Sequence, residues 1–518
     1  SYLEMLTTEQ RIAHCTLMDT HKIWVAAERL NEVQIVFPDY TATSTITAII
    51  DNKNQDFTKE QAILELMRSR LEGLGPVTAN QLATDAAMDA ADINQALLAL
   101  EQEGFAIRGQ FTSNEDQLEW CDRRLLARIH RYTIKSLRSE IKPVSISDFM
   151  QFLFHWHHLY DKVESKDALL DIVEQLEGFS IQASAWETDI FPSRMSFYLP
   201  DWMDGLCNSG RINWMRIASS NANSKSKSTP IRITPIALML RQHTSAWLNN
   251  ADGEPPSLPG NAQTLLNLLK HNGALFFDDL VSESNLLRSQ VETALGQLVA
   301  RGLVTSDSFV GLRALITPSN RRPGFGSRRR LNSNALNIED AGRWTLIKIT
   351  NEEENASQTI EHIAKILLKR YGVVFRKLLE RENNLPSWRE LLYVYRRMEA
   401  RGEVRGGRFV AGFSGEQFAV PDAVSLLRKA SQHSQQDLVV ISAVDPLNLT
   451  GFILPGPRVT NSNKNKILFR NGKPIAISKN GQVGFLEELD QSLQWQAQTT
   501  LLKKHSPSQV MTPPLQSI

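Results

Sequence analysis

Residues 273–303 read GALFFDDLVSESNLLRSQVETALGQLVARGL, and residues 75–105, GPVTANQLATDAAMDAADINQALLALEQEGF, repeat their pattern. In each segment a glycine follows an apolar helix pattern. Two more helix patterns come next, and a charged residue with a glycine then precedes a short strand pattern. The framing glycines are 29 positions apart in both copies, and 30 apart in a third copy from Gly372 to Gly402. Three helices with a two-stranded wing are typical of a winged helix-turn-helix, a module used mostly to bind nucleic acid.

Apolar residues recur at the same offsets in the first two copies. Counted from the opening glycine, they are Leu82, Ile93, Leu97 and Leu100 in one copy and Leu280, Val291, Leu295 and Leu298 in the other. The last three of each set have i, i+4, i+7 spacing, which predicts one buried face on the third helix. The third copy carries Leu379, Leu391, Tyr395 and Met398.

Composition is ordinary for a globular protein of 518 residues, with 42% apolar and 22% charged residues. This length allows about three to five domains. No apolar run is long enough to span a bilayer, and the first residues lack the pattern of a signal peptide. The three cysteines, Cys15, Cys121 and Cys207, are far apart, which argues against a disulfide framework or zinc ribbon and predicts a cytoplasmic protein.

Net charge is zero, with 57 basic and 57 acidic residues. A nucleic-acid-binding protein of zero net charge must concentrate positive charge locally. Whole-chain electrostatics alone therefore does not favour DNA binding.

The predicted fold class is mainly α with small β: tandem winged-helix domains followed by a C-terminal β-barrel-like domain. Strands are expected at 438–442, 451–454, 466–470 and 474–478 in this last domain. The predicted segments are the end of a preceding domain (1–58), a first winged unit (59–118), a helical, degenerate winged unit (119–218), a linker with a strand (219–260), a second winged unit (261–317), a basic linker (318–357), a third winged unit (358–430) and the small β domain (431–518).

The third copy carries a more specific signature. It contains Trp388-Arg389-Glu390, then RRMEARGEVRGGRFV at 396–410 and GEQFAVP at 415–421. These stretches closely resemble the large helicase-related (Lhr) family of bacterial superfamily-2 helicases. Further matches, in the family order, are WVAAER (24–29), EWCD (119–122), EGF (177–179), WE (186–187), GLVTSD (302–307) and GRW (342–344).

The resemblance implies two RecA-like motor domains, several winged helices and a β-barrel. This sequence has neither a G-x-x-x-x-G-K-[ST] phosphate loop nor an acidic Walker B pair, so it looks like the non-motor, C-terminal portion of such a helicase. ATP and Mg²⁺ are expected only for the motor, and no cofactor or metal for this segment. The same portion is similar to winged-helix DNA glycosylases, and the final residues look shorter than the family's usual C-terminus.

Arginines form the candidate nucleic-acid contacts. One cluster lies on a Gly/Pro/Ser-rich segment without acids, where it could neutralise phosphates. A second group lies on the third helix and wing of the third winged unit, a docking geometry known for this fold. The alternatives are a solvated loop for the first group and a protein–protein surface for the second. The candidates are Arg321, Arg322, Arg328, Arg329, Arg330, Arg389, Arg396, Arg397, Arg405 and Arg408.

Candidate catalytic residues are few. A glycosylase needs a carboxylate or polar group to position water and stabilise the sugar cation, and Asp445, Glu416 and Gln417 are the first to test. The alternative for Asp445 is an ordinary Asp-Pro turn. Gln494-Trp495-Gln496 is a weaker candidate, and His155 with His158 could form a metal pair only on one helix face. The four tryptophans at 120, 186, 202 and 214 are expected mostly in the core.

Three functions follow as hypotheses. The first is the nucleic-acid-binding accessory region of an ATP-dependent 3′–5′ DNA-repair helicase, with single-stranded, tailed or forked DNA, or a DNA:RNA hybrid, as partner. The second is a glycosylase for uracil or alkylated bases, and the third an oligomerisation scaffold forming a homo-oligomer.

Overall fold

The computed structural model describes residues 2–17, 21–47, 57–112, 117–217, 230–248, 258–317, 338–347, 356–432 and 437–503. The chain divides into two compact units, Ser1–Leu137 and Arg138–Ile518, each of which is described by itself.

The first unit begins with a small sheet. Helix α1 (Tyr2–Thr8) is followed by strands β1 (Ile12–Leu17), β2 (His21–Ala26) and β3 (Thr41–Ala42), which pair in the order β2-β1-β3. The helices η1 (Ala27–Arg29) and α2 (Leu30–Val36) connect β2 to β3. Alternate residues of β1, namely Ala13, Cys15 and Leu17, point into the core, as expected for a strand buried on one face. Trp24 lies on the neighbouring strand β2, where it pairs with His14 of β1.

The rest of the first unit is a winged helix. It contains α3 (Lys59–Gly73), β4 (Val77–Thr78), α4 (Ala79–Ala86), α5 (Ala90–Gln102), β5 (Ala106–Gly109) and β6 (Glu119–Asp122). Thr58 and Thr78 form capping boxes at the starts of α3 and α4, which satisfy free backbone amides there. The sheet order is β4-β6-β5, so the last strand lies between the other two.

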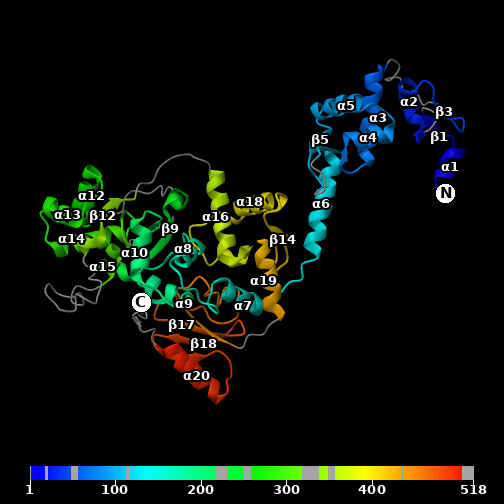
Figure 1. The fold of residues 1–518 in the computed structure, drawn as a ribbon. Coiled ribbons are helices and arrows are strands. Elements are labelled where there is room, and N and C mark those ends of the chain that lie inside the picture. The colour runs from blue at the N-terminus through cyan, green and yellow to red at the C-terminus, as the bar shows by residue number, and fades with distance from the viewer. Residues whose placement is uncertain are drawn as a thin grey trace, which may run out of the picture. The chain divides into compact units, whose positions relative to one another are not determined.

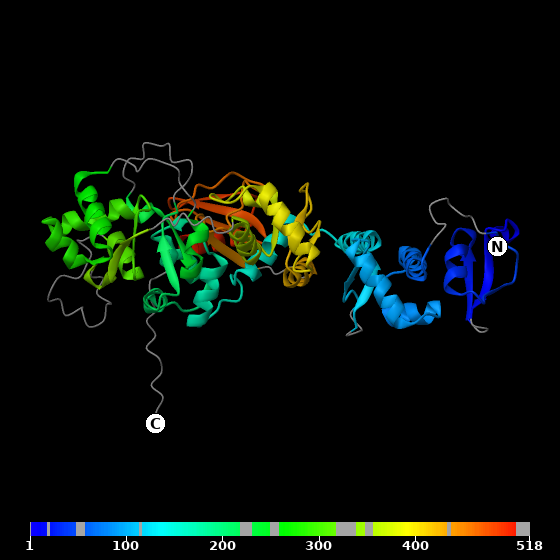
Figure 2. The same cartoon turned by 90° about the horizontal axis from the view of Figure 1, so that it is seen from above.

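Three more units with this topology lie in the second part of the chain (Figures 1 and 2), so the predicted tandem winged helices are confirmed. One contains α8 (Lys166–Gln175), β7 (Ile181–Gln182), η2 (Trp186–Ile190), α9 (Phe191–Arg194), α10 (Pro200–Asn208), β8 (Ile212–Met215) and β9 (Pro235–Leu240). The next contains α12 (Gly260–Asn272), β10 (Leu275–Phe276), α13 (Phe277–Ser284), α14 (Arg288–Val299), β11 (Val304–Ser306) and β12 (Arg343–Leu346). The third winged unit contains α16 (Ala356–Tyr371), β13 (Val373–Phe375), α17 (Arg376–Leu379), α18 (Trp388–Ala400), β14 (Arg405–Gly407) and β15 (Gln417–Ala419).

The central strand of three units lies beyond the boundaries read from the sequence. Strands β6, β9 and β12 begin after positions 118, 218 and 317, yet each pairs with both other strands of its unit. The wing between the second and third strand varies in length, so helix periodicity gave no signal for it. The segments 219–260 and 318–357 thus include parts of winged units.

A glycine ends the third helix of all four units. Gly104, Gly210, Gly302 and Gly402 have φ angles of 73°, 72°, 71° and 76°. This left-handed conformation favours glycine because it has no Cβ, and it turns the chain from the helix into the wing. The charged-residue-plus-glycine signal in the sequence is therefore a helix C-terminal motif.

The C-terminal domain is an open sheet. Strands β16 (Leu438–Ser442), β17 (Lys466–Arg470), β18 (Lys473–Lys479) and β19 (Gln482–Phe485) pair antiparallel in chain order, and α20 (Gln491–Leu502) lies along them next to β18 (Figure 1). Among the described strands β16 and β19 do not pair, so the predicted barrel closure is not found. The strand expected at 451–454 is a turn with one bridge between Thr450 and Leu454.

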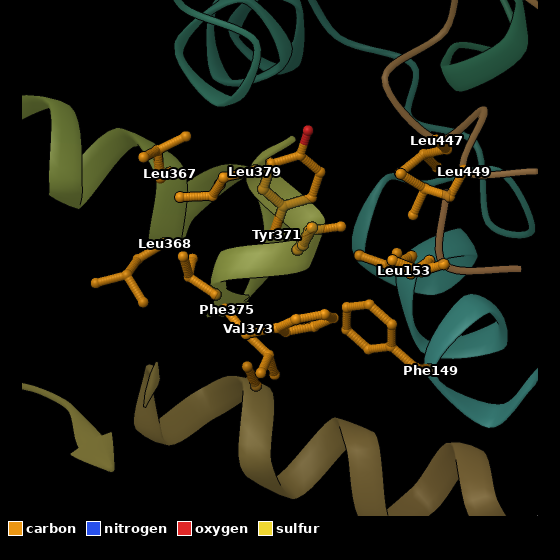
Figure 3. Packing of buried hydrophobic residues seen from close by; sticks show 14 of the residues in the cluster. Phe149, Leu153, Leu367, Leu368, Tyr371, Val373, Phe375, Leu379, Leu447 and Leu449 are labelled. Carbon is orange, nitrogen blue, oxygen red and sulfur yellow. The ribbon is translucent and has the colours of Figure 1, made fainter. Parts of the chain in front are cut away.

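The largest core joins the third winged unit to α7 (Ile146–Trp156) and the C-terminal sheet. Figure 3 shows Phe149 and Leu153 of α7 facing Tyr371 and Phe375, with Leu447 nearby. Trp120, Trp186 and Trp214 are buried, as predicted, whereas Trp202 is only partly buried. None of the helices in the described part of the chain combines the length and apolar character needed to cross a bilayer.

Candidate functional site

Helix α18 presents a cationic face from the third winged unit. Ser387 starts it with a capping box: its hydroxyl accepts from Glu390 N, and the Glu390 side chain returns to Ser387 N. Leu391, Val394, Tyr395 and Met398 are buried on one side. The opposite side exposes Arg389, Tyr393, Arg396 and Arg397, with Tyr393 67% exposed.

Part of this positive charge is paired within the unit. Arg396 Nη2 lies 2.6 Å from Glu416 Oε2, and Arg397 and Arg401 both reach Glu361, at 3.8 and 2.9 Å. Such exposed pairs are weak and exchange readily with other ions. They hold the arginines in place without removing them from solvent.

Three predicted arginines of this unit are unpaired. Arg389 on α18, Arg405 on β14 and Arg408 just after it are exposed and form no ion pair with any residue that the structure describes. Helix α18 and strand β14 lie next to each other (Figure 1). The helix and wing therefore offer free guanidinium groups from both of the elements with which winged helices usually contact DNA.

The equivalent helices of two other units differ in charge. Helix α5 contains Asp92 and Glu101 and no basic residue. Helix α14 contains Arg288, which pairs with Asp278 and Glu339. Of these three helices, only α18 carries several exposed arginines, and not all of them are paired with an acidic residue that the structure describes.

The other predicted arginines, Arg321, Arg322, Arg328, Arg329 and Arg330, lie outside the described residues. A further basic surface, which was not among the predicted contacts, lies on α6 (Arg123–Ser139). Arg124, Arg128, Arg131 and Lys135 follow one face of this helix, and it has no acidic residue and no buried residue. Spacing of i, i+4, i+7 and i+11 was the available signal.

Glu416 and Gln417 hold the wing together. Glu416 accepts from Arg138 and Arg396, and Arg138 also donates to Glu399 through Nε at 2.8 Å. Gln417 is buried; its Oε1 accepts from the amides of Phe409 and Val410 at 2.9 and 2.8 Å. These contacts fix the loop that follows β14.

Asp445 lies inside the protein rather than on a surface. Its two oxygens accept from Arg194 Nη1 and Nη2 at 2.8 and 3.0 Å, and Oδ1 also accepts from Leu447 N at 2.9 Å. Arg194 in turn lies 3.4 Å from His157 Nδ1, whose ring Nε2 is 2.7 Å from Arg370 O. The Asp445 carboxylate therefore links the C-terminal sheet to the winged unit that contains α9.

The other sequence candidates lie apart from this network. Trp495 is on α20 and exposed. His155 and His158 do not share a helix face, because α7 ends at Trp156 and His158 has a positive φ of 57°.

A different group could hold a metal ion. Glu177, which follows α8, His243 of η4 (Arg241–His243) and His362 of α16 place one ligand atom each within 4.8 Å of the others. They are distant in the sequence, so no local spacing could have indicated them.

Comparisons with known proteins agree with the sequence resemblance. Residues 144–236 and 353–439 each match a family model described as "Large helicase-related protein, winged-helix domain". The chain therefore carries two winged-helix domains of the large helicase-related family, and the one at 144–236 corresponds to the unit predicted as degenerate.

Two curated relatives are similar over most of the chain. One is the "Lhr helicase/ probable uracil glycosylase" of Mycolicibacterium smegmatis, 27% identical over 440 residues, which are 81% of this chain and 28% of that protein. The other is the "Lhr helicase/uracil glycosylase" of Escherichia coli K12, 27% identical over 74% of this chain and 26% of that protein. The chain thus spans about a quarter of the length of these relatives.

A solved structure, Streptomyces sahachiroi DNA glycosylase AlkZ, can be superimposed with a TM-score of 0.41 and 11% sequence identity. The match covers 70% of this chain and 96% of the AlkZ chain.

Proposed function

We propose that this chain binds DNA through the cationic face of its third winged unit, as the non-motor region of a helicase of the large helicase-related family. One observation carries the proposal: Arg389, Arg405 and Arg408 are exposed on the helix and wing without an ion-pair partner among the described residues. Guanidinium groups in this arrangement can contact phosphates on both sides of a groove.

The charge distribution supports a local contact. The chain as a whole is neutral, so attraction for a polyanion must come from a surface such as this one. Tyr393 lies among the arginines and is exposed, with the Arg397 guanidinium 5.9 Å from its ring centre. An exposed aromatic ring beside cations can stack on an unpaired base, which favours a tailed or forked substrate over a plain duplex.

The names of the relatives support the DNA partner. Both are called helicases, and the chain corresponds to about a quarter of each. Because this sequence lacks the phosphate-binding motifs of a motor, ATP-driven unwinding is assigned to the remainder of such a protein. This segment would hold the DNA, or a DNA:RNA hybrid, during unwinding.

The test is the affinity of the full chain for a fluorescent tailed duplex, measured by anisotropy. The triple variant R389A/R405A/R408A is expected to bind about tenfold or more weakly at low salt, because up to three phosphate contacts are removed. A matched control, K22A/K473A/K479A, removes three exposed positive charges from β2 and β18 and is expected to bind as the wild type does. A triple variant that binds normally would overturn the proposal.

The helix α6 provides a third arm of the same experiment. The variant R124A/R128A/R131A removes three cations of its basic stripe. If only this variant binds weakly, DNA binding belongs to α6 rather than to the third winged unit.

Base removal is a second candidate function, favoured by one observation: the two relatives, named "probable uracil glycosylase" and "uracil glycosylase", match most of this chain. Of the candidate carboxylates, Glu416 retains solvent access, with its side chain 27% exposed. Asp445 would have to leave Arg194 before it could reach a sugar.

The assay is release of uracil from a labelled oligonucleotide, detected by alkaline cleavage at the abasic site. Uracil release by the full chain that is lost in E416Q, with DNA affinity retained, would support this activity. Absence of cleavage with enzyme in excess would refute it for this segment.

A further inference from the structure

We propose that Glu177, His243 and His362 bind a divalent transition-metal ion, with Zn²⁺ as the best fit, and that the ion clamps two winged units together. Glu177 lies in one matched domain, residues 144–236, and His362 in the other, residues 353–439. His243 follows β9, the central strand of the first of these units.

The spacing of the three groups suits coordination. His243 Nδ1 lies 3.1 Å from both carboxylate oxygens of Glu177, and His362 Nε2 lies 3.3 Å from Oε1. A tetrahedral ion with bonds of about 2.0–2.1 Å separates neighbouring ligand atoms by about 3.3 Å. Two histidines and a carboxylate are also a common ligand set for zinc.

Hydrogen bonds alone satisfy this arrangement poorly. Oε1 of Glu177 has three nitrogens around it: Trp247 Nε1 at 2.9 Å, His243 Nδ1 at 3.1 Å and His362 Nε2 at 3.3 Å. A carboxylate oxygen has about two lone-pair directions, so it cannot accept three well-directed bonds. With an ion between the groups, Trp247 keeps its hydrogen bond and both imidazoles turn lone pairs, not protons, toward the centre.

The charge balance points the same way. The Glu177 side chain is completely buried. Its oxygens contact His243, His362 and Trp247. Metal-binding imidazoles are neutral, so in that state these side chains bring no positive charge to the buried carboxylate. A divalent ion would supply the missing positive charge.

The surroundings can complete the coordination shell. His243 and His362 side chains are 26% and 23% exposed, so a water molecule can reach the remaining position. The far ring nitrogen of His243 lies 3.1 Å from the Gln242 amide, whose oxygen, after an amide flip, would accept from Nε2–H. Trp247 orients the carboxylate in the same way.

The test uses the untagged full chain, freed of metal by chelator and dialysis. Calorimetric titration with Zn²⁺ is expected to show one equivalent bound with a dissociation constant at or below about 1 µM, since a preformed site needs little reordering. Co²⁺ in place of Zn²⁺ should give the visible absorption bands of a tetrahedral site.

Three variants and one control decide the outcome. H243A, H362A and E177Q should each weaken Zn²⁺ binding at least about tenfold, whereas H271A, at an exposed position on α12, should bind as the wild type does. The two histidines are partly exposed, so their variants are expected to fold, which circular dichroism checks. The proposal is overturned if the wild type binds no stoichiometric Zn²⁺, or if H243A and H362A bind it unchanged.

Discussion

Arg194 and Asp445 form a two-pronged ion pair sealed inside the protein, with side chains 0% and 2% exposed. The pair joins α9 of one winged unit to the loop after β16 of the C-terminal sheet. Breaking one partner of such a pair leaves the other charge buried without compensation, which costs far more than loss of a surface pair.

The variant D445N is expected to lower the free energy of unfolding of the second unit by about 3–5 kcal/mol. Urea denaturation followed by tryptophan fluorescence measures this loss. Because a chain of several domains need not unfold in one step, the first resolved transition of D445N is compared with that of the wild type. E28Q is the control, since it removes the exposed Arg11–Glu28 pair, and no measurable change is expected. Equal stability of D445N and the wild type would contradict a structural role for Asp445.

Release of the paired arginines should strengthen DNA binding. Glu416→Gln releases Arg396 from its ion pair, and Glu361→Gln releases Arg397, whereas Arg401 keeps its ion pair with Glu403. Each variant is expected to bind a tailed duplex about two- to tenfold more tightly at low salt. Anisotropy titration checks this, and unchanged or weaker binding by both variants would show that these arginines do not face DNA.

The glycines with left-handed conformation should differ sharply in their tolerance of alanine. Gly402 has a φ of 76° and open space around its missing Cβ, so G402A should cost about 1–2 kcal/mol of backbone strain. Gly178 has the same φ, but a Cβ there would overlap the Trp247 indole. G178A should therefore add about 1–3 kcal/mol of overpacking. Thermal denaturation of the two variants compares them; equal losses would refute this packing argument.

His157 should make stability depend on pH. Burial, followed by the charge of Arg194, holds the His157 pKa well below 6.5. In the folded state His157 is neutral, with its Nε2–H donating to Arg370 O. The unfolded chain binds a proton below about pH 6.5, so the stability from this group is complete above that pH and is lost as pH falls, by up to about 1.4 kcal/mol per pH unit.

The variant H157Q keeps an amide donor for the Arg370 carbonyl but cannot titrate. Urea midpoints measured from pH 8 to pH 5 should fall less steeply for H157Q than for the wild type, and H271Q, on an exposed histidine, should keep the wild-type slope. Parallel curves for H157Q and the wild type would mean that His157 does not remain neutral in the folded state.

Local patterns predicted the helices and the C-terminal glycines well, because both depend on residues within one or two turns. Leu97 and Leu295 are buried as their spacing indicated, and Gly302 lies between the third helix and the strand, where the pattern placed it. A strand was expected within 219–260, but the pairing of β9 and β12 with the earlier strands of their winged units was missed, because these partners lie across long wings. Pairing between distant segments leaves no period in the sequence.

The candidate site residues divide in the same way, into those that local sequence indicated and those that depend on distant partners. Sequence alone placed Arg389 and Arg405 on the helix and wing, and both are exposed there. It gave no sign that Asp445 would meet Arg194, 251 positions away, or that Glu177 would meet His362, 185 positions away. Such partners are chosen by tertiary packing. For the same reason the turn signal at Asp445 conveyed its local geometry but not its burial.

The most direct test of the central claim is the salt dependence of DNA binding. The dissociation constant for a tailed duplex is measured between about 50 and 200 mM KCl for the wild type and for R389A/R405A/R408A. If these arginines bind phosphates, the slope of log affinity against log salt should be shallower in the variant by about 2–3, roughly 0.9 for each duplex phosphate that the variant no longer neutralises. Identical slopes for the two proteins would contradict DNA binding through the third winged unit.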